Sequence, residues 1–585
     1  MPPVKFSLNF APIPASESAR ARRRRSLLLA VALIAVLPLA WRGPSCGQDF
    51  DFHLQNWLDV AAHWRHGVLY PHWSVSANYL AGEPRFIFYP PLSWITGALL
   101  GLALPWSWTP LAFTLLALVG AGFSFRAMAR QWLPDDNATL AACLYVVNPY
   151  MLFVVYERGA LAELLAAVWM PLLVLFALRE KTSFLPLSLI VAALWLTNAP
   201  AGVMGCYMLA ILVAVAALRE KRWRPIARAA SAVALGLALA GFWLVPATYQ
   251  QRWVEIHRAL GPLMRVEDSF LFGYVKVSAM TSVESFNIIY HNQVLHSVSW
   301  IVVALMLAAA LAAWQARKRR SPLWMPFVAV AVIVSALQFR FSRPLWHLAP
   351  KLQYLQFPWR WMLVLALAAA LLIGLSLKTE ATTRRAISVR ALVLLVFAAG
   401  MTVLTSFFFW QPCDDEDNVQ AQIATFHTTG FEGTDEYTPQ GADNGDIPSG
   451  LPPILVLSSA QAELPTPDNP VQPPQPVPAS IMIDRWSPEF HSAIVNPSRP
   501  AFALLRLMDY PAWRIVVNGI VLRNPPYRTD GLLAIPLEAG PNRIVVRWHT
   551  TPDQWAGDAL SLAALAVTLA IGWKGRRMPH DDSIR

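Results

Sequence analysis

Two carboxylates and an imidazole lie within five residues of each other in the segment Gln48-Asp49-Phe50-Asp51-Phe52-His53. The interleaved phenylalanines are typical of an apolar interfacial surface, where partial loss of hydration raises carboxylate pKa values and suits a general base. The structural alternative is helix capping, because Asp is a favoured N-cap and the stretch as far as His66 has a helical pattern. One aspartate can serve as the cap, which leaves the other unexplained. We therefore select Asp49 and Asp51 as candidate catalytic residues and His53 as a candidate substrate-binding residue.

A second polar group, Glu157-Arg158-Gly159-Ala160-Leu161-Ala162-Glu163, joins two apolar runs. Glu163 lies about one turn inside the second run, where an acidic side chain costs about 2.5 to 3.5 kcal/mol near a membrane centre and less toward its surface. Such a residue usually faces a cavity or a partner. The structural alternative, an internal ion pair between Glu157 or Glu163 and a nearby arginine, stays open. Six residues of helix rotate by about 600°, so the two glutamates would point in different directions and have different roles.

Arg360 lies in the segment Tyr354-Leu355-Gln356-Phe357-Pro358-Trp359-Arg360-Trp361, at the start of a later apolar run. Tryptophan is ordinary at a membrane interface and arginine can extend from there to water, so a purely structural interpretation is strong. An arginine on the outer side nevertheless needs an attraction, which a lipid phosphate would supply through paired hydrogen bonds. We expect His53, Glu157, Arg158, Glu163 and Arg360 to bind substrate or donor phosphate.

The elements that must position these residues are apolar. The chain has 585 residues, of which 56% are hydrophobic and only 14% charged, and its mean hydropathy is +0.41. These values exclude an ordinary soluble enzyme and a disordered chain. Twelve apolar runs are long enough to span a membrane: 26–41, 109–125, 138–156, 160–178, 183–199, 201–218, 228–247, 297–314, 322–339, 360–377, 390–409 and 556–573.

The run 91–104 has 14 residues, and as a helix it would reach only about 21 Å against a membrane core of about 30 Å. We expect a short re-entrant or tilted helix there, with a thirteenth span as the alternative. The fold class is thus a polytopic α-helical membrane protein of about 12 spans.

Basic residues set the predicted orientation. Alternate loops hold 25 of the 47 lysines and arginines, and such loops are typically cytoplasmic. This places both termini in the cytoplasm. Because the clusters lie at the ends of apolar runs, membrane anchoring explains them better than nucleic acid binding, and we expect no nucleic acid partner.

This orientation leaves three large outer segments and the following domains. Residues 1–409 form the transmembrane domain, with outer loops 42–90 and 248–296. Residues 410–479 are first acidic and then proline-rich, with nine prolines in 452–478, and we expect an extended linker or sheet edge there. Short β-like runs separated by turns predict a β-sandwich-like outer domain in 480–555. Residues 556–585 form the last helix and a basic cytoplasmic tail.

Cysteines and metal ligands give weaker signals. Cys143 and Cys206 lie in apolar runs and are expected to be buried. Cys46 and Cys413 both fall on the predicted outer side, where oxidation is permitted, but nothing in their spacing demands a disulfide. The sequence leaves the metal unknown; a divalent cation, Mg or Mn, is a cofactor that bridging of acidic residues and phosphate would allow.

Several short motifs occur in an order that spans nearly the whole chain. Besides the groups above, they are Gly82-Glu83-Pro84, Phe88-Tyr89-Pro90-Pro91-Leu92, Glu436-Tyr437-Thr438-Pro439 and Tyr510-Pro511-Ala512-Trp513. With these motifs the chain resembles the GT-C superfamily of membrane glycosyltransferases. More narrowly, it is similar to the bacterial membrane proteins labelled "6-pyruvoyl-tetrahydropterin synthase related" and to YfhO-type proteins. No compact histidine-rich zinc group of a pterin synthase is visible.

The resemblance implies a function. A GT-C glycosyltransferase moves a sugar from a polyprenyl-phosphate donor to an acceptor, here an envelope glycan, lipid or protein. It acts in the bilayer, at the outer face of the bacterial cytoplasmic (inner) membrane, with acidic catalytic residues in the first outer loop. Asp49 or Asp51 would then be the base, and Arg158 and Arg360 would stabilise the departing phosphate. The alternatives are a lipid or glycan transporter or flippase, and a non-catalytic envelope scaffold.

Overall fold

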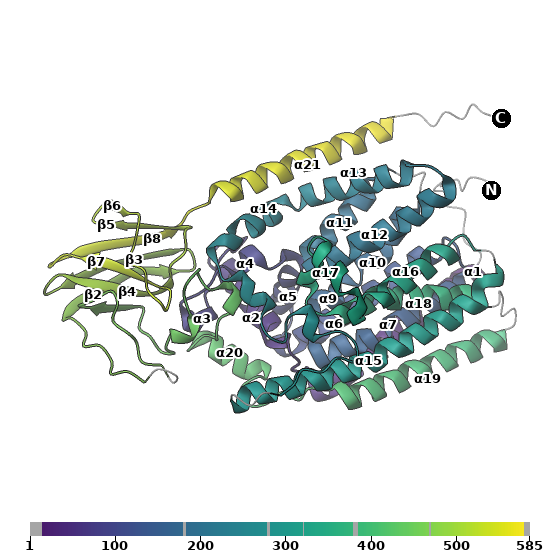
Figure 1. The fold of residues 1–585 in the computed structure, drawn as a ribbon, viewed down its shortest axis with the longest axis horizontal. Helices are drawn as coiled ribbons and strands as arrows, with labels where there is room; N and C mark the ends of the chain where they lie inside the picture. The colour runs from purple at the N-terminus through teal and green to yellow at the C-terminus, as the bar shows by residue number, and fades with distance from the viewer. Residues whose placement is uncertain are drawn as a thin grey trace.

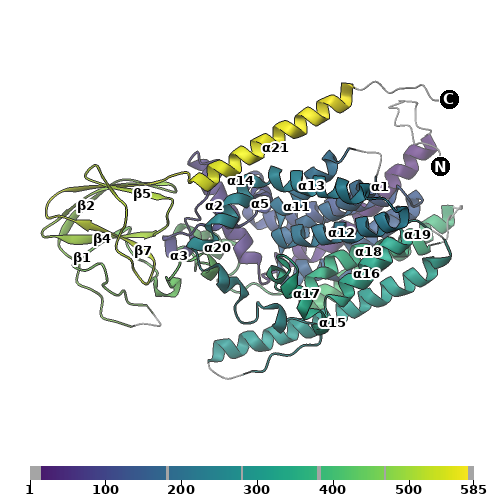
Figure 2. The ribbon, with the colours of Figure 1, turned by 45° about the horizontal axis from the view of Figure 1, so that its top comes forward.

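A long bundle of helices carries a separate β-sheet region at one end (Figure 1). The computed structural model describes residues 15–179, 183–277, 281–319, 321–377, 384–466 and 470–577. In two views, the short helices α3 (Ala77–Leu80) and α20 (Val419–His427) lie where the bundle meets the sheets (Figures 1 and 2).

Nine helical segments in the described part of the chain are long and apolar enough to cross a membrane. They contain the helices α1 (Ala15–Arg42), α6 (Thr109–Ala129), α7 (Asp135–Val146) with α8 (Pro149–Phe153), α9 (Leu161–Ala166) with α10 (Trp169–Leu178), α12 (Ala199–Glu220), α15 (Ser282–Ala316), α18 (Met362–Ser376), α19 (Arg384–Phe409) and α21 (Pro552–Arg577). Two further pairs are bent at a short break: α13 (Arg224–Leu239) with α14 (Gly241–Tyr249), by 77°, and α16 (Trp324–Ala336) with α17 (Arg343–Leu348), by 93°. Counting each pair as one span gives up to eleven.

The predicted count of twelve spans is therefore not confirmed. The run 183–199 forms only α11 (Leu185–Thr197), whose 13 residues reach about 20 Å. The helix stops because Asn198 is extended and caps α12 instead, accepting a hydrogen bond from the Ala201 amide at 2.9 Å. The doubtful run 91–104 is likewise a short helix, α5 (Pro91–Ala103).

Residues 42–90, predicted to lie on the outer side and called the first outer segment below, fold into the helices α2 (Phe50–Arg65), α3 and α4 (Arg85–Phe88) between α1 and α5. Helix α2 packs closely on α5, because Gly97 leaves room for the indole of Trp57. A Cβ at position 97 would lie 2.0 Å from that ring. This contact fixes the helix that begins beside Asp49.

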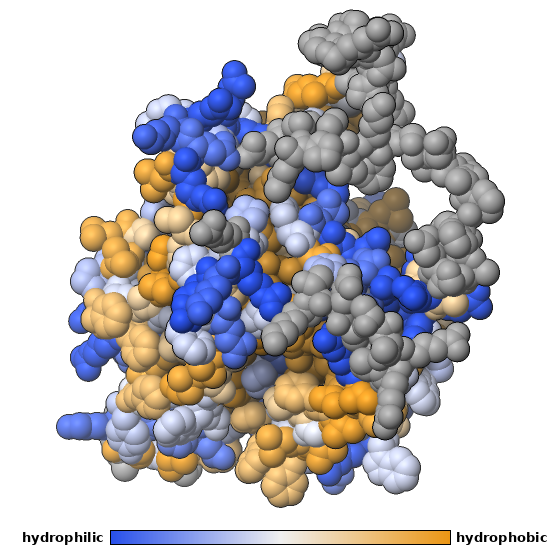
Figure 3. All heavy atoms as spheres, turned by 90° about the vertical axis from the view of Figure 1, so that its right-hand side faces the viewer, coloured by the Kyte–Doolittle hydropathy of each residue, from blue (hydrophilic) through white to orange (hydrophobic). Residues whose placement is uncertain are grey.

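Charged groups gather at the end of the bundle opposite the β sheets. Helix α1 begins there and helix α21 ends there (Figure 1), and hydrophilic side chains are prominent on this end face (Figure 3). Arg24 pairs with Asp135 at 2.9 Å and with Asp136 at 2.7 Å. Along the side of the bundle, α21 exposes the apolar residues Leu562 and Leu569. Apolar flanks between two polar ends are what a membrane-spanning protein requires.

The β region consists of two antiparallel sheets that share one apolar core. The strand orders are β1-β4-β7 and β2-β3-β8-β5-β6. The strands are β1 (Ile454–Leu457), β2 (Ala479–Ser487), β3 (Phe490–Pro497), β4 (Ala501–Met508), β5 (Trp513–Val517), β6 (Ile520–Leu522), β7 (Leu532–Leu537) and β8 (Asn542–Trp548). Trp73 and Ile87 of the first outer segment also belong to this core. The sheets begin earlier than the predicted boundary at 480, since β1 is a four-residue edge strand that follows two prolines.

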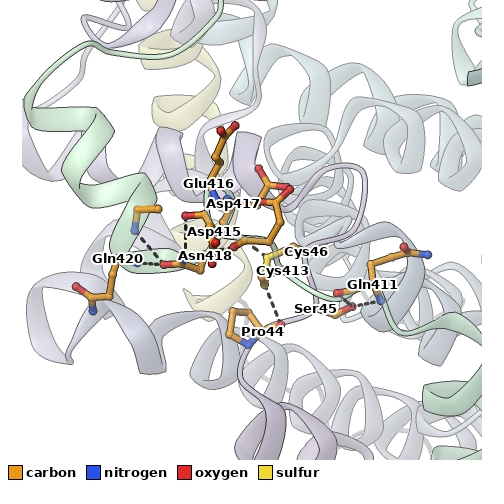
Figure 4. Close-up of a disulfide and its surroundings, with 12 residues drawn as sticks. Pro44, Ser45, Cys46, Gln411, Cys413, Asp415, Glu416, Asp417, Asn418 and Gln420 are labelled. Carbon is orange, nitrogen blue, oxygen red and sulfur yellow. Dashed lines mark hydrogen bonds between the residues drawn. A yellow bond between two sulfur atoms is a disulfide. The ribbon is translucent and has the colours of Figure 1, made fainter. Parts of the chain in front are cut away.

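A disulfide joins Cys46 to Cys413, with their Cα atoms 5.0 Å apart (Figure 4). It ties the first outer segment to the chain that leaves α19. The Cys46 amide also donates a hydrogen bond to the Gln411 carbonyl at 3.0 Å. Of the two possibilities left open by the sequence, the structure shows the paired one; Cys143 is free and buried, and Cys206 is free and half-buried.

Candidate active site

Two backbone segments far apart in the sequence touch where Asp49 begins α2. The Asp49 amide donates a hydrogen bond to the Arg158 carbonyl at 2.8 Å. The approach needs glycine on both sides. A Cβ at Gly47 would lie 2.1 Å from the Glu157 carbonyl oxygen, and one at Gly159, whose φ is +60°, would lie 2.9 Å from Phe50. The Gly-containing motif after Glu157 thus serves to bring Arg158 against the first outer segment.

Asp49, Arg158 and Glu163 form a chain of ion pairs. The Arg158 guanidinium donates to Asp49 at 3.1 Å and to Glu163 at 2.7 Å. The Tyr150 hydroxyl donates a hydrogen bond to the other Glu163 oxygen. Arg158 is fully buried, whereas 39% of the Asp49 side chain is exposed. Among these ion-paired residues, Asp49 is therefore the one that an arriving molecule can reach.

Arg360 completes this group from another helix. Its Nε lies 3.7 Å from Glu163, and its guanidinium lies over the ring of Phe357, 5.1 Å from the centroid. Arg158 lies over Trp359 at 5.1 Å. Aromatic faces attract guanidinium groups, so the aromatic residues around Arg360 hold both cations.

The supporting helices are the most enclosed parts of the bundle. Arg158 ends the candidate span Asp135–Arg158 and Arg360 lies in the first turn of the candidate span Pro358–Ser376; 83% of the apolar window of each is buried. A π-helical turn, Val154–Arg158, precedes Gly159, and such turns are frequent at functional sites. The two arginines thus lie on helices that tight packing holds in place.

His53 lies one turn into α2 and contacts the same group. Its Nε2 accepts a hydrogen bond from the Ala162 amide at 3.5 Å. Burial lowers the pKa of His53 to about 4, against an opposing effect of the Asp49 charge. His53 is therefore neutral at pH 7, and its visible role is to hold the segment before Glu163.

Asp51 lies apart from the ion pairs. It lines a cavity of about 240 Å³ together with Gln48, Tyr290, Gln411 and Asp417. Burial raises the pKa of the Asp51 carboxyl, and the charges of Asp49 and Asp417 raise it further. The structure thus separates the two aspartates of the motif.

Neither aspartate behaves as the simple cap that the sequence allowed. Asp49 occupies the N-cap position of α2, but its side chain makes no capping hydrogen bond and pairs with Arg158 instead. Asp51 lies in the first turn, and one of its oxygens accepts a hydrogen bond from the Phe52 amide at 2.7 Å.

The two glutamates of the second motif have different partners. Glu157 accepts hydrogen bonds from the Tyr290 hydroxyl at 2.7 Å and from the Gln411 side chain at 3.0 Å. Both of these partners line the cavity of Asp51, whereas Glu163 pairs with Arg158 and Arg360. Sequence reasoning missed Tyr150, Tyr290 and Gln411, because single tyrosines and glutamines near apolar runs carry no distinguishing pattern.

A second buried polar cluster stabilises the first outer segment. Arg85 pairs with Glu83 at 2.6 Å, and Asp59 accepts hydrogen bonds from the hydroxyls of Ser74 and Ser76 at 2.5 and 2.7 Å. Arg85 also lies over the Phe52 ring, 4.7 Å from its centroid. This cluster supports α2, because Asp59 and Phe52 both belong to that helix.

No metal-binding group of three or more His, Cys, Asp or Glu side chains occurs in the part of the chain that the structure describes. Asp49 and Glu163 already share the Arg158 guanidinium as their common cation. These two carboxylates by themselves do not form a ligand set for Mg or Mn.

The fold and the site define a polytopic membrane protein with a buried cluster of two arginines and a glutamate beside a reachable aspartate. The family described as "6-pyruvoyl-tetrahydropterin synthase related domain; membrane protein" matches residues 86–411. Since this match covers more than half of the chain, the protein belongs to that family of membrane proteins.

Among solved structures, the chain is similar to the arabinofuranosyltransferase AftD from Mycobacteria, with 20% identity, a TM-score of 0.42, and coverage of 67% of this chain and 27% of AftD. The oligosaccharyltransferase of Archaeoglobus fulgidus is 12% identical with a TM-score of 0.38, and the match covers 67% of this chain and 57% of that protein. ArnT from Cupriavidus metallidurans, bound to undecaprenyl phosphate, is 13% identical with a TM-score of 0.28, and the match covers 65% of this chain and 88% of ArnT. The chain thus spans about a quarter of AftD. No curated protein sequence matches the chain. All three TM-scores lie below 0.5, so the argument for a function rests on the site.

Proposed function

We propose that the protein is a GT-C-type glycosyltransferase that moves a sugar from a polyprenyl-phosphate donor to an envelope acceptor. The proposed place of action is the outer face of the bacterial cytoplasmic membrane, with both termini in the cytoplasm. The observation that carries the proposal is the contact of 3.1 Å between the exposed Asp49 carboxylate and Arg158, inside a cluster that also contains Arg360.

The cluster suits a lipid phosphate. The two positive charges of Arg158 and Arg360 are balanced by the carboxylates of Glu163 and Asp49, so the cluster has a net charge of +1 once Asp49 takes up a proton. The Nε atoms of both arginines have no hydrogen-bond partner among the described residues. A phosphate oxygen accepts such hydrogen bonds well. Because the cluster lies at the ends of apolar helices, a polyprenyl tail would lie along the bilayer while its phosphate meets the arginines.

The reaction follows from this placement. An acceptor hydroxyl attacks the anomeric carbon, the bond from that carbon to the phosphate oxygen breaks, and the lipid phosphate leaves with the electron pair. Asp49 takes the hydroxyl proton, since an alcohol needs a base within about 2.6 to 3.2 Å. Arg158 and Arg360 stabilise the charge that grows on the phosphate. A direct displacement of this kind inverts the configuration at the anomeric carbon.

The remaining candidate residues have supporting roles in this mechanism. Neutral His53 positions the Ala162 amide before Glu163. Asp51 and Tyr290 line the adjoining cavity, where their carboxylate and hydroxyl groups can bind the acceptor, and Glu157 holds the Tyr290 hydroxyl by a hydrogen bond.

The proposal is tested by mass spectrometry of envelope glycans from a deletion strain complemented with variants. We expect the deletion to remove or truncate a glycan, the wild-type gene to restore it, and Asp49→Asn to fail at normal membrane abundance. The matched control is Asp415→Asn, an exposed aspartate in another outer segment, which should restore the glycan fully. Full restoration by both Asp49→Asn and Asp51→Asn would sink the proposal, as would movement of labelled lipid across vesicles without glycosyl transfer.

A further inference from the structure

A cavity of about 530 Å³ lies between the β region and two outer segments of the helical part. Its lining comes from three stretches far apart in the sequence: 252–253, 439–442 and 509–532. None of the lining residues belongs to the Asp49 site. The walls are tied together, because the Gln440 amide donates to the Trp253 carbonyl at 3.0 Å and the Tyr510 hydroxyl donates to the Gln250 side chain at 2.7 Å.

The cavity has a rigid aromatic floor and accessible aromatic walls. Tyr510 and Trp513 form the floor, and both are buried. Trp513 packs edge-on against Trp548, with centroids 5.1 Å apart. The walls include the half-buried Trp253, edge-on to Tyr510 at 5.6 Å, and Tyr527, which is 56% exposed. The Tyr527 hydroxyl donates a hydrogen bond to the Gly441 carbonyl, which joins two walls.

Polar groups lie among these rings. Asp509 is half-buried and lines the cavity, and no ion pair to its carboxylate is found among the described residues. Burial raises the pKa of Asp509 to about 6, against a smaller opposing effect of the Tyr510 amide. Arg252 and Arg523 are exposed at the same cavity. A carboxylate acceptor and guanidinium donors thus flank flat apolar surfaces.

This combination matches one ligand class. A saccharide ring has an apolar face that packs on aromatic rings and a rim of hydroxyls that both donate and accept hydrogen bonds. Binding cavities of about 300 to 1,000 Å³ hold compact ligands with a few well-placed polar groups, and the observed volume would hold about two or three sugar rings on that scale. A lipid tail would offer the half-buried Asp509 carboxylate no hydrogen bond beyond that of the Tyr510 amide, which is costly for a carboxylate.

We propose that this cavity binds a neutral oligosaccharide, separately from the Asp49 site. Only its interpretation as the acceptor glycan rests on the proposed function; saccharide binding itself does not. A site of this kind on the β region would hold a growing glycan near the membrane while its end is extended.

The test is binding of fluorescently labelled oligosaccharides to the full chain in lipid nanodiscs, measured by fluorescence anisotropy. The probes are neutral tri- to hexasaccharides of glucose, mannose, galactose, arabinose and N-acetylglucosamine, together with a proline-rich decapeptide of similar size. The variants are Trp253→Ala, Asp509→Asn and Asp49→Asn. The matched control is Trp223→Ala, which removes an exposed tryptophan outside the cavity.

We expect at least one oligosaccharide to bind. Asp509→Asn should weaken this binding about tenfold or more, as loss of a hydrogen bond to a charged group does. Trp253→Ala should weaken it about tenfold or more as well, because an aromatic wall of the cavity is lost. Trp223→Ala and Asp49→Asn should leave the affinity unchanged. Binding that survives Asp49→Asn while glycans remain normal in the deletion strain would overturn the glycosyltransferase proposal and keep this one. The inference is overturned if no oligosaccharide binds, if the peptide alone binds, or if the cavity variants bind as the wild type does.

Discussion

Asp49 and Asp51 are two residues apart and lie in opposite environments. Asp49 is partly exposed and pairs with a buried arginine. Asp51 lines a small cavity with another acid, Asp417, and its raised pKa reflects burial and neighbouring negative charge. Equal chemistry and nearly equal position in the sequence have therefore produced different roles. The partners contributed by distant segments decide which carboxylate stands beside cations and which stands beside acids.

The surroundings of Asp49 and Asp51 therefore offer different chemistry to a substrate. On the Asp49 side, Arg158 and Arg360 offer a place for a leaving group that gains negative charge. On the Asp51 side, Glu157, Tyr290 and Gln411 offer hydrogen bonds for hydroxyl groups.

The largest effect is expected for Asp49→Asn. Loss of a positioned general base lowers transfer by about 100-fold or more, whereas Asp51→Asn should lower it by less than about tenfold. Initial rates of transfer in nanodiscs measure both variants. A greater loss for Asp51→Asn would reverse the roles assigned to the two sides.

The second effect is on stability, from replacing Cys46 and Cys413 together by serine. Removal of a disulfide costs about 2 to 4 kcal/mol in typical cases, and this bond fastens the segment that carries both aspartates. We expect a lower melting temperature in thermal unfolding scans, and a matching drop when the wild type is reduced. Cys206→Ser, at a free cysteine, is the control. Four titratable thiols in the untreated protein would contradict the pairing.

The third effect comes from Arg360→Lys, which keeps the positive charge and removes the planar fork. Lysine cannot make the paired hydrogen bonds of a guanidinium, so we expect transfer to fall about tenfold, mainly through a higher KM for the lipid donor. Arg340→Lys, at an exposed position in a neighbouring segment, should change nothing. An unchanged KM for the donor in Arg360→Lys would remove Arg360 from the phosphate site.

The smallest effect is a pH-dependent gain in stability for Asp51→Asn. The folded-state pKa of Asp51 lies above the ordinary value of 3.8, so the folded protein binds this proton more tightly than the unfolded chain does. The wild type therefore loses stability as the pH rises from about 3.8 to the higher pKa that Asp51 has in the folded state. Asp51→Asn should melt at a higher temperature than the wild type at pH 7, and the difference should vanish near pH 3.8. A variant less stable than the wild type at pH 7 would show that the Asp51 carboxylate is a favourable interaction.

The predicted helices agree with the structure where the signal comes from neighbouring residues. They differ where a contact with a distant residue decides the structure. Apolar runs mark α1, α6 and α12 because hydropathy depends only on neighbouring residues. The bend between α13 and α14 occurs at Gly241, where Gly557 of α21 approaches so closely that a Cβ on Gly557 would lie 2.6 Å from the Gly241 carbonyl. No pattern within 228–247 could have revealed a contact with a helix more than three hundred residues later.

Sequence patterns selected the residue types of the candidate site, whereas only the family resemblance placed Asp49, Arg158 and Arg360 together. Charged residues in apolar surroundings drew attention to Asp49, Arg158, Glu163 and Arg360. Their assembly depends on the pair Asp49–Arg158, which bridges 109 residues, and no sequence spacing encodes it. Tyr150 was missed because a lone tyrosine in an apolar run is ordinary, although it supplies a hydrogen bond to Glu163.

The span of the disulfide also determines when the site can be completed during synthesis. Cys46 and Cys413 are separated by 367 residues, so the bond cannot close until the ribosome has made more than two thirds of the chain. Throughout that period the segment bearing Asp49 is not yet fastened to the chain that follows α19. The disulfide can therefore fasten the proposed site only after most of the helices around that site have been synthesised.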